Sequence, residues 1–173
     1  GQRRVGKSFL LYQLIEEILG KEPDANIIYI NLEDFAFSSL QTAEDLHSYI
    51  ISHSKEKVKN YIFIDEIQDI PGFEKVIRSL LLNEDNDIYI TGSNAKMLSG
   101  ELATYLSGRY IEFKIYSLSY SEFLEFHGLT ESETSYELYS RYGGLPYLLN
   151  LPLEDETVNE YLKSVYSTIV FRD

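Results

Sequence analysis

The sequence contains no cysteine among its 173 residues. This absence excludes a disulfide framework, a zinc site built on thiolates and a cysteine nucleophile. It also agrees with a cytoplasmic location, which we expect for this protein. No apolar run approaches the roughly 18 residues that indicate a membrane span, so we expect no membrane partner.

Basic residues are scarce, with 15 lysines and arginines against 28 aspartates and glutamates, and the formal net charge is −13. Such acidity disfavours a surface dominated by contacts with nucleic-acid phosphates, although it is compatible with a local basic patch. The hydrophobic share of 44% and the charged share of 25% are ordinary for globular proteins, which argues against disorder. Composition therefore predicts an acidic globular protein and leaves its chemistry open.

Apolar periodicity predicts helices and strands that alternate along the first two thirds of the chain. Helical spacing predicts a helix from Lys7 to Leu19 that Gly20 ends, and further helices after Thr42 and around Pro71. Three apolar runs predict buried strands, namely Asn26–Leu32, Tyr61–Asp65 and Asp87–Thr91. The alternation over Tyr110–Ile115 predicts an edge or late strand. Strands separated by helices indicate βαβ units and a parallel sheet.

The first eight residues carry the most specific motif. Gly1-Gln-Arg-Arg-Val-Gly-Lys-Ser8 matches G-x-x-x-x-G-K-[ST] at every specified position. Its glycines let backbone amides face an anion, Lys7 offers a charge to the β- and γ-phosphates, and the Ser8 hydroxyl can ligate Mg²⁺. The predicted phosphate-binding residues are Gly1, Gln2, Arg3, Arg4, Val5, Gly6, Lys7 and Ser8. For the two arginines a solvated role is the alternative.

A second acidic motif follows the second predicted strand. Asp65 ends that strand, and Glu66 comes next in the sequence. In a P-loop NTPase such an aspartate holds Mg²⁺, usually through water, and the following glutamate can orient and deprotonate the attacking water. The alternative is that both acids only cap the next turn. Gln68 could help place water, or it could be a hydrogen-bonded turn residue.

Polar residues also follow the third predicted strand, in Thr91-Gly-Ser-Asn94. The carboxyl ends of strands line the ligand crevice of doubly wound sheets, so Ser93 or Asn94 could reach the γ-phosphate or the attacking water. We favour Asn94 as a catalytic residue because its amide both donates and accepts hydrogen bonds. A simple turn is the alternative.

Several motifs in a fixed order carry a family resemblance over almost the whole chain. They are Gly1–Ser8, Tyr61-Ile-Phe-Ile-Asp-Glu-Ile-Gln68, Ile90-Thr-Gly-Ser-Asn94, Leu106-Ser-Gly-Arg-Tyr110, Ser117-Leu-Ser-Tyr-Ser-Glu-Phe123 and Tyr142-Gly-Gly-Leu-Pro146. The chain resembles the AAA-type ATPase domain of a prokaryotic family, in which a C-terminal domain of unknown function with nuclease-like features usually follows. The resemblance implies ATP binding and probable hydrolysis with Mg²⁺ at the two motifs above.

The resemblance also implies roles for two residues outside those motifs. Arg109 is suggested as a catalytic arginine that stabilises charge, in cis or from a neighbouring subunit, with a surface ion pair as the alternative. Gly143-Gly-Leu-Pro146 is similar to the Gly-x-Pro element of signalling NTPases, whose proline packs near the adenine. The alternative is that Gly143 and Gly144 form a helix C-cap and Pro146 opens the next helix.

These observations predict a three-layer α/β P-loop NTPase core of the additional-strand, AAA-like class over residues 1–117, with a parallel sheet. A helical lid and the start of a linker to a downstream domain are predicted over residues 118–173. The phosphate loop opens the chain, so we expect the first strand to be missing from it and nucleotide binding by this piece alone to be impaired.

The predicted function is Mg²⁺-dependent ATP hydrolysis coupled to a conformational change, with a nucleotide as ligand. A non-hydrolysing nucleotide switch or scaffold and a DNA-handling module are the alternatives. A homo-oligomer or a protein partner bound through the downstream domain is possible, and the net charge does not support DNA as a partner.

Overall fold

The computed structural model describes residues 4–92, 106 and 108–172. Two compact units make up this structure. One unit holds Lys7–Phe113, and the other holds the chain from Lys114 onward together with residues 4–6. The domain boundary predicted at residue 117 stays a prediction.

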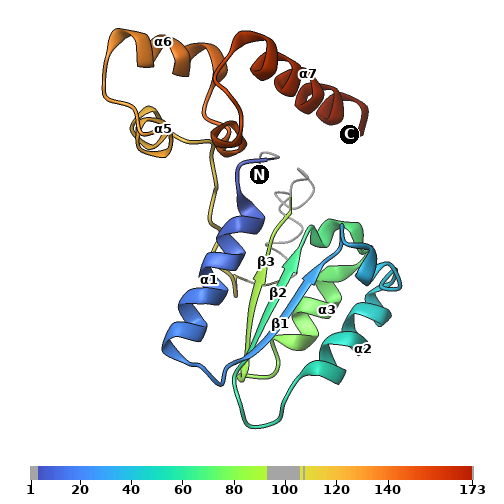
Figure 1. The fold of residues 1–173 in the computed structure, drawn as a ribbon. Coiled ribbons are helices and arrows are strands. Elements are labelled where there is room, and N and C mark those ends of the chain that lie inside the picture. Colours follow the sequence, from blue (N-terminus) through green and yellow to red (C-terminus); the bar gives the residue numbers. More distant parts are fainter. Residues whose placement is uncertain (1–3, 93–105, 107, 173) are drawn as a thin grey trace. The chain divides into compact units, whose positions relative to one another are not determined.

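The first unit is built on a three-stranded parallel sheet (Figure 1). Its strands are β1 (Asn26–Asn31), β2 (Asn60–Asp65) and β3 (Asn86–Ile90), in the order β1-β2-β3. All six residues of the central strand β2 are buried, which explains the continuous apolar run of Tyr61–Ile64 between its polar ends. At the amino ends, the strands are bridged by three asparagine side chains in register: Asn26 donates to Asn60 at 2.8 Å, and Asn60 donates to Asn86 at 3.3 Å.

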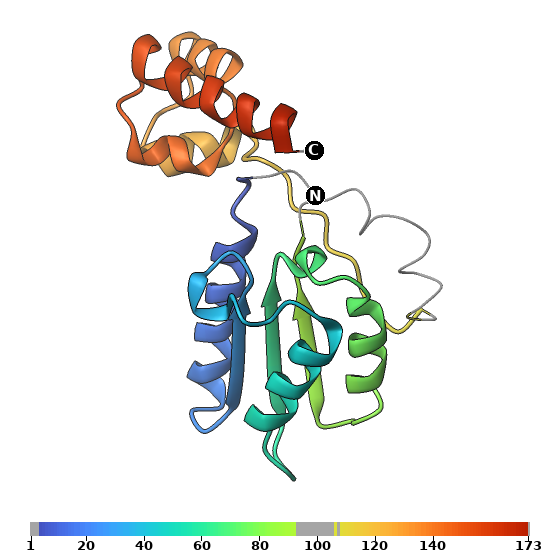
Figure 2. The same ribbon diagram turned by 90° about the vertical axis from the view of Figure 1, so that its right-hand side faces the viewer.

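The two faces of the sheet carry different side chains because successive residues of a strand point to opposite faces. The face that packs against α1 (Lys7–Lys21) is largely aromatic and is formed by Ile27, Tyr29, Tyr61, Phe63 and Tyr89. The face that packs against α2 (Ala43–His53) and α3 (Phe73–Leu80) consists of Ile28, Ile30, Ile62, Ile64, Ile88 and Ile90. Helices therefore cover both faces, and the predicted three-layer α/β core with a parallel sheet is confirmed (Figures 1 and 2).

The helix boundaries correct two predictions. α1 includes Gly20 and ends at Lys21, so the predicted stop at Gly20 is wrong; the glycine has no positive φ there, and Pro23 follows shortly afterwards. α3 begins at Phe73 with Gly72 at its N-cap, so Pro71 precedes the helix. The helix predicted after Thr42 is confirmed, since the Thr42 hydroxyl accepts a hydrogen bond from the backbone N–H of Asp45.

The strand predicted at Tyr110–Ile115 is wrong. Residues 109–119 have no regular secondary structure and pair with no described strand. The side chains of Ile111 and Phe113 are 79% and 77% exposed. Alternating apolar residues form a strand only where they pair with a neighbouring strand, and this segment pairs with none of the described ones.

The second unit is helical wherever the structure describes regular elements. It contains α5 (Tyr120–His127), α6 (Glu133–Tyr142), the 3₁₀ helix η4 (Pro146–Asn150) and α7 (Asp155–Arg172). Tyr142, Leu148 and Val158 form its buried core. These elements agree with the helices predicted over residues 118–173. None of the described helices of the chain is both long and apolar enough to span a membrane.

Candidate functional site

The carboxyl ends of the three strands form the centre of the candidate site. Asn31 and Asp65 are in register on β1 and β2, and Ile64 is in register with Ile90 on β3. Thr91, which follows Ile90, therefore lies beside Asp65. The Asp65 side chain ends the fully buried strand and is only 1% exposed. A carboxylate so buried requires polar partners, because removing it from water is costly.

Thr91 is the polar partner that the structure gives to Asp65. Its hydroxyl donates a hydrogen bond to Oδ1 of Asp65 and accepts one from the backbone N–H of Glu66 at 3.3 Å. The carbonyl oxygen of Thr91 also accepts from the backbone N–H of Ile67 at 3.0 Å. One threonine thus holds both acidic residues and the turn behind them. The sequence prediction named Ser93 and Asn94 and missed Thr91. The register between the second and third strands, which places Thr91 beside Asp65, would have been the signal for it.

Glu66 occupies a strained backbone position. Its φ of 56° and ψ of 45° lie in the left-handed region, which is unfavourable for residues with a Cβ. The turn η2 (Ile67–Asp69) follows at once, and both Ile67 and the subsequent Ile70 are buried in the core. These apolar anchors, together with the hydrogen bonds that the backbone N–H groups of Glu66 and Ile67 donate to Thr91, maintain the strained turn. Non-glycine residues in this conformation persist only where the surroundings impose it, often at functional sites.

Gln68 contacts the side chain of Glu66 directly. Its amide Nε2 donates to Oε2 of Glu66 at 2.5 Å, which is a short, charge-assisted hydrogen bond. Gln68 is therefore a hydrogen-bonded residue of this turn, and this bond leaves its predicted role in placing water open. Its other polar atom, Oε1, is buried and has no hydrogen-bond partner among the described residues.

The phosphate loop is described from Arg4 onward, so Gly1, Gln2 and Arg3 lie outside the described residues. Arg4 and Gly6 have positive φ values of 62° and 91°, whereas Val5 and Lys7 do not. Such an alternation of left- and right-handed residues turns successive backbone N–H groups toward one side and forms an anion-binding concavity. The sign of φ therefore alternates along residues 4–7, as it does in loops of this kind.

The candidate residues of the first unit belong to one end of the sheet. The chain reverses after α1, and β1 packs antiparallel to it, so the N-terminal end of α1 and the carboxyl ends of the strands lie at the same end (Figures 1 and 2). Lys7 and Ser8 are the first residues of α1. They thus share this end with Asp65, Glu66 and Thr91.

Tyr29 adds an uncharged hydroxyl on the aromatic face of the sheet. Burial raises its pKa, and the hydrogen bond that its hydroxyl donates to Tyr12 at 3.1 Å and the nearby Asp65 charge act in the same direction. A tyrosine in these surroundings stays neutral and adds no second anion near Asp65.

The residues present fit a magnesium ion that is bound together with a nucleotide. The described residues contain no group of three or more histidine, cysteine, aspartate or glutamate side chains placed to hold a metal by themselves. Mg²⁺ differs from zinc in this respect, since it commonly takes one or two protein oxygens and completes its shell with phosphates and water. A site that draws only on Asp65 and Ser8 would suit such an ion, and both residues stay predicted ligands.

The packing of the second unit explains the residue types of the Gly-Gly-Leu-Pro segment. Gly143 ends α6 with φ 73°, and Pro146 opens η4, so these two residues have the positions that the helix-cap alternative predicted. A side chain at Gly144 would overlap the Leu118 backbone, whose N–H donates to the Gly144 carbonyl at 2.7 Å. A Cβ at Gly6 would lie 3.9 Å from Pro146, and both residues belong to the second unit. The predicted contact of Pro146 with a base stays a prediction.

The other predicted catalytic residues contribute less to the described geometry. Asn94 and Ser93 lie outside the described residues. Arg109 is exposed and forms no ion pair with any described residue. Its backbone N–H donates to Leu106 at 3.0 Å. The role of Arg109 as a charge-stabilising residue stays a prediction.

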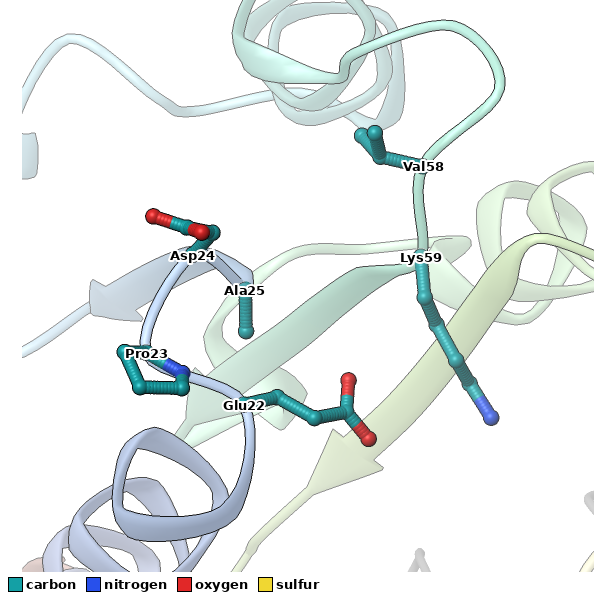
Figure 3. A pocket seen from close by; sticks show the side chains of 6 residues that line it. All are labelled: Glu22, Pro23, Asp24, Ala25, Val58 and Lys59. Atoms are coloured by element: carbon teal, nitrogen blue, oxygen red, sulfur yellow. The ribbon is translucent and has the colours of Figure 1, made fainter.

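A pocket of about 310 Å³ lies away from these residues (Figure 3). Its lining residues precede β1 and β2 and are Glu22, Pro23, Asp24, Ala25, Val58 and Lys59. The pocket is therefore at the amino ends of the strands, opposite Asp65. Two of its charged groups have partners, since Glu22 accepts from the Tyr61 hydroxyl at 3.0 Å and Lys59 lies 3.7 Å from Asp87.

Comparison with known proteins agrees with this geometry. Residues 1–124 match a family described as an AAA domain. The chain belongs to this family. It is 40% identical over 185 residues to an uncharacterized protein of Haemophilus influenzae, and this match covers all of the chain and 44% of the relative. It is 32% identical over 186 residues to an uncharacterized protein of Methanocaldococcus jannaschii, with all of the chain and 40% of the relative covered.

The chain thus spans less than half the length of these curated relatives. Membership of the AAA domain family supports a nucleotide-binding, ATPase-like function. The family match ends at residue 124, within α5, so most of the helical unit lies beyond it.

Proposed function

We propose that this AAA domain binds ATP with Mg²⁺ and that the intact protein hydrolyses it, coupling hydrolysis to a conformational change. The observation that carries the proposal is the arrangement at the end of β2. There a buried Asp65 and the adjacent Glu66 are both held by Thr91, at the same end of the sheet as the first turn of α1. Polar side chains at the carboxyl ends of parallel strands are typical of ligand sites in open α/β sheets.

Each candidate residue would have a distinct role in binding or hydrolysis. The alternating backbone of residues 4–7 and the charge of Lys7 bind the phosphates. Ser8 and Asp65 would hold a magnesium ion, which would neutralise charge on the phosphates. Glu66 accepts a proton from the attacking water, and stabilisation of the transferring phosphoryl group would fall to Arg109 and Asn94.

Steady-state phosphate release by the full-length protein tests this proposal. Glu66→Gln keeps the size of the side chain and removes the base, so we expect a fall in rate of roughly 100-fold or more with ATP still bound. Lys7→Ala removes a phosphate contact and should abolish both binding and hydrolysis. Lys21→Ala, at the far end of the same helix where Lys21 pairs with Glu17 at 2.5 Å, is the matched control and should leave both unchanged.

A nucleotide-held switch or scaffold would give a different result. Tight ATP binding with the same negligible rate in the wild type and in Glu66→Gln would establish the switch and overturn hydrolysis. A homo-oligomer, a protein partner and DNA stay predictions from the sequence. Analytical ultracentrifugation of the full-length protein with and without ATP would test the first of them.

A further inference from the structure

The amide of Gln68 has two ends with different surroundings. Its Nε2 is bound to Glu66 at 2.5 Å, and its Oε1 is buried without a hydrogen-bond partner among the described residues. The reverse orientation of the amide would place its oxygen against the Glu66 carboxylate, which repels it, so the hydrogen-bond network selects the observed orientation. Gln68 therefore presents an unsatisfied acceptor beside the carboxylate of Glu66.

A buried acceptor without a partner is unfavourable, because it has lost its hydrogen bond to water and gained none in return. It is satisfied once a donor binds beside it. The backbone around Gln68 is well anchored, since Ile67 and Ile70 are buried and the N–H of Ile67 donates to Thr91 at 3.0 Å. The turn thus holds an acceptor and a carboxylate side by side on a fixed backbone.

We propose that Gln68 places the attacking water together with Glu66. This inference rests on the proposed ATP hydrolysis. A water molecule has two O–H groups, and it would donate one to Glu66 and the other to Oε1 of Gln68. Both hydrogens are then held, and a lone pair of the water oxygen is left to attack.

In the reaction step the water oxygen forms a bond to the γ-phosphorus while the bond from that phosphorus to the bridging oxygen breaks. The electron pair of the broken bond leaves with ADP. Glu66 takes the first proton of the water, and the second stays on the product phosphate. Gln68 gains and loses no proton, and its Nε2 keeps the Glu66 carboxylate in place throughout.

Two variants of the full-length protein test this role. Gln68→Ala removes both contacts, and Gln68→Glu keeps the size of the side chain but replaces the Nε2 donor with an oxygen that repels Glu66. We expect kcat to fall roughly 100-fold in both variants, as for the loss of a placed polar group in an active site. KM for ATP and the dissociation constant of a non-hydrolysable ATP analogue should change less than about twofold, because Gln68 contacts the water and not the nucleotide. Gln13→Ala, an exposed glutamine on α1, is the control.

A double-mutant cycle separates this role from a merely structural one. With Glu66 already replaced by glutamine, Gln68→Ala should lower kcat no further, because residues that act as a unit are not additive. Thermal unfolding without nucleotide tests the Gln68–Glu66 contact independently of hydrolysis, because it measures Tm. There the loss of Tm from Gln68→Ala should shrink by at least half when Glu66 is already alanine, since their hydrogen bond is already gone.

The outcomes separate the two proposals. If Glu66→Gln abolishes hydrolysis and Gln68→Ala retains more than half of the wild-type kcat, only the role of Gln68 is overturned. Additive losses of Tm overturn the Gln68–Glu66 contact, whether or not the protein hydrolyses ATP. Equal rates for the wild type and Glu66→Gln overturn the proposed hydrolysis and the role of Gln68 with it.

Discussion

Two turns of this protein contain a residue with positive φ, and the two residues are of different types. In the helical unit, Gly143 ends α6 with φ 73°, and its N–H donates to the carbonyl of Tyr139 at 2.8 Å. In the sheet unit, Glu66 follows β2 with φ 56°. From Lys114 onward, the described residues with positive φ are all glycines, namely Gly128 and Gly143. Glycine adopts this conformation without steric cost, whereas a residue with a Cβ loses about 1–2 kcal/mol.

The difference between the two residues indicates that the turn after β2 has a role beyond stabilising the fold. A glycine at position 66 would suit the backbone better but would remove the carboxylate that lies beside Asp65 and binds Gln68. Thr91 and two buried isoleucines hold the turn after β2 in its strained form. The turn after α6 serves chain reversal and close packing, and its sequence suits that purpose. Strain that packing maintains around a polar side chain is consistent with a functional site.

We expect the largest loss of stability from a substitution that disrupts the turn after α6. Gly144→Ala would place a methyl group in overlap with the Leu118 backbone, so we expect the helical unit to lose about 3 kcal/mol or more. Gly20→Ala is the matched control, because a Cβ there meets nothing within 4 Å inside α1 and should stabilise the protein by about 0.5–1 kcal/mol. Chemical denaturation followed by circular dichroism measures both. An unchanged midpoint for Gly144→Ala would contradict the close backbone contact.

We expect the next largest effect from a substitution that removes hydrogen bonds from the turn after β2. Thr91→Val keeps the shape of the side chain but removes the hydroxyl that serves Asp65 and the Glu66 N–H. The two groups left without that partner should cost about 1–3 kcal/mol of stability, and ATP hydrolysis should fall about tenfold. Thr168→Val, whose hydroxyl bonds to the carbonyl of Ser164 within α7, is the control. A variant with full stability and rate would show that Thr91 does not hold the acidic pair.

A smaller effect separates strain from function. Glu66→Gly should raise the stability by about 1 kcal/mol by relieving the left-handed strain, while hydrolysis is lost. Lys57 is also left-handed, with φ 61°, in the loop before β2, so Lys57→Gly should stabilise to a similar extent and leave hydrolysis intact. Thermal unfolding and phosphate release report the two properties. Destabilisation by both glycines would argue against strain as the cause.

The smallest effect concerns alkaline pH and the aromatic face of the sheet. Burial, and then the nearby Asp87, raises the pKa of Tyr89 to about 12. The Tyr89 hydroxyl ionises near pH 10 in the unfolded chain and at a higher pH in the folded chain. Its contribution to the stability of the fold is therefore complete below pH 10 and is lost as the pH rises from 10 to 12. Tyr89→Phe should therefore flatten the fall of Tm in that range. Tyr166→Phe, exposed on α7, is the control, and an equal slope in Tyr89→Phe and the wild type would contradict the prediction.

Local pattern was sufficient for most of the sheet unit. The apolar runs around Ile28, Phe63 and Ile88 lie in strands as predicted, because continuous apolar segments are stable where both faces are covered. The segment Tyr110–Ile115 shows the limit of this reasoning. Its alternation is a property of one segment, whereas strand formation depends on a second one that offers hydrogen bonds. Gly20 shows the same limit, since a glycine stops a helix only where the chain adopts a left-handed turn.

The sequence by itself determined the residue types of the candidate site and their order: a glycine-flanked loop before a helix, and an acidic pair after an apolar strand. Those features depend on neighbours along the chain, so they are readable without coordinates. Only the tertiary structure decided that Thr91 bonds to Asp65, that Glu66 is left-handed and that Gln68 presents a buried acceptor beside it. These contacts depend on strand register and on burial, which arise from packing between segments distant in sequence.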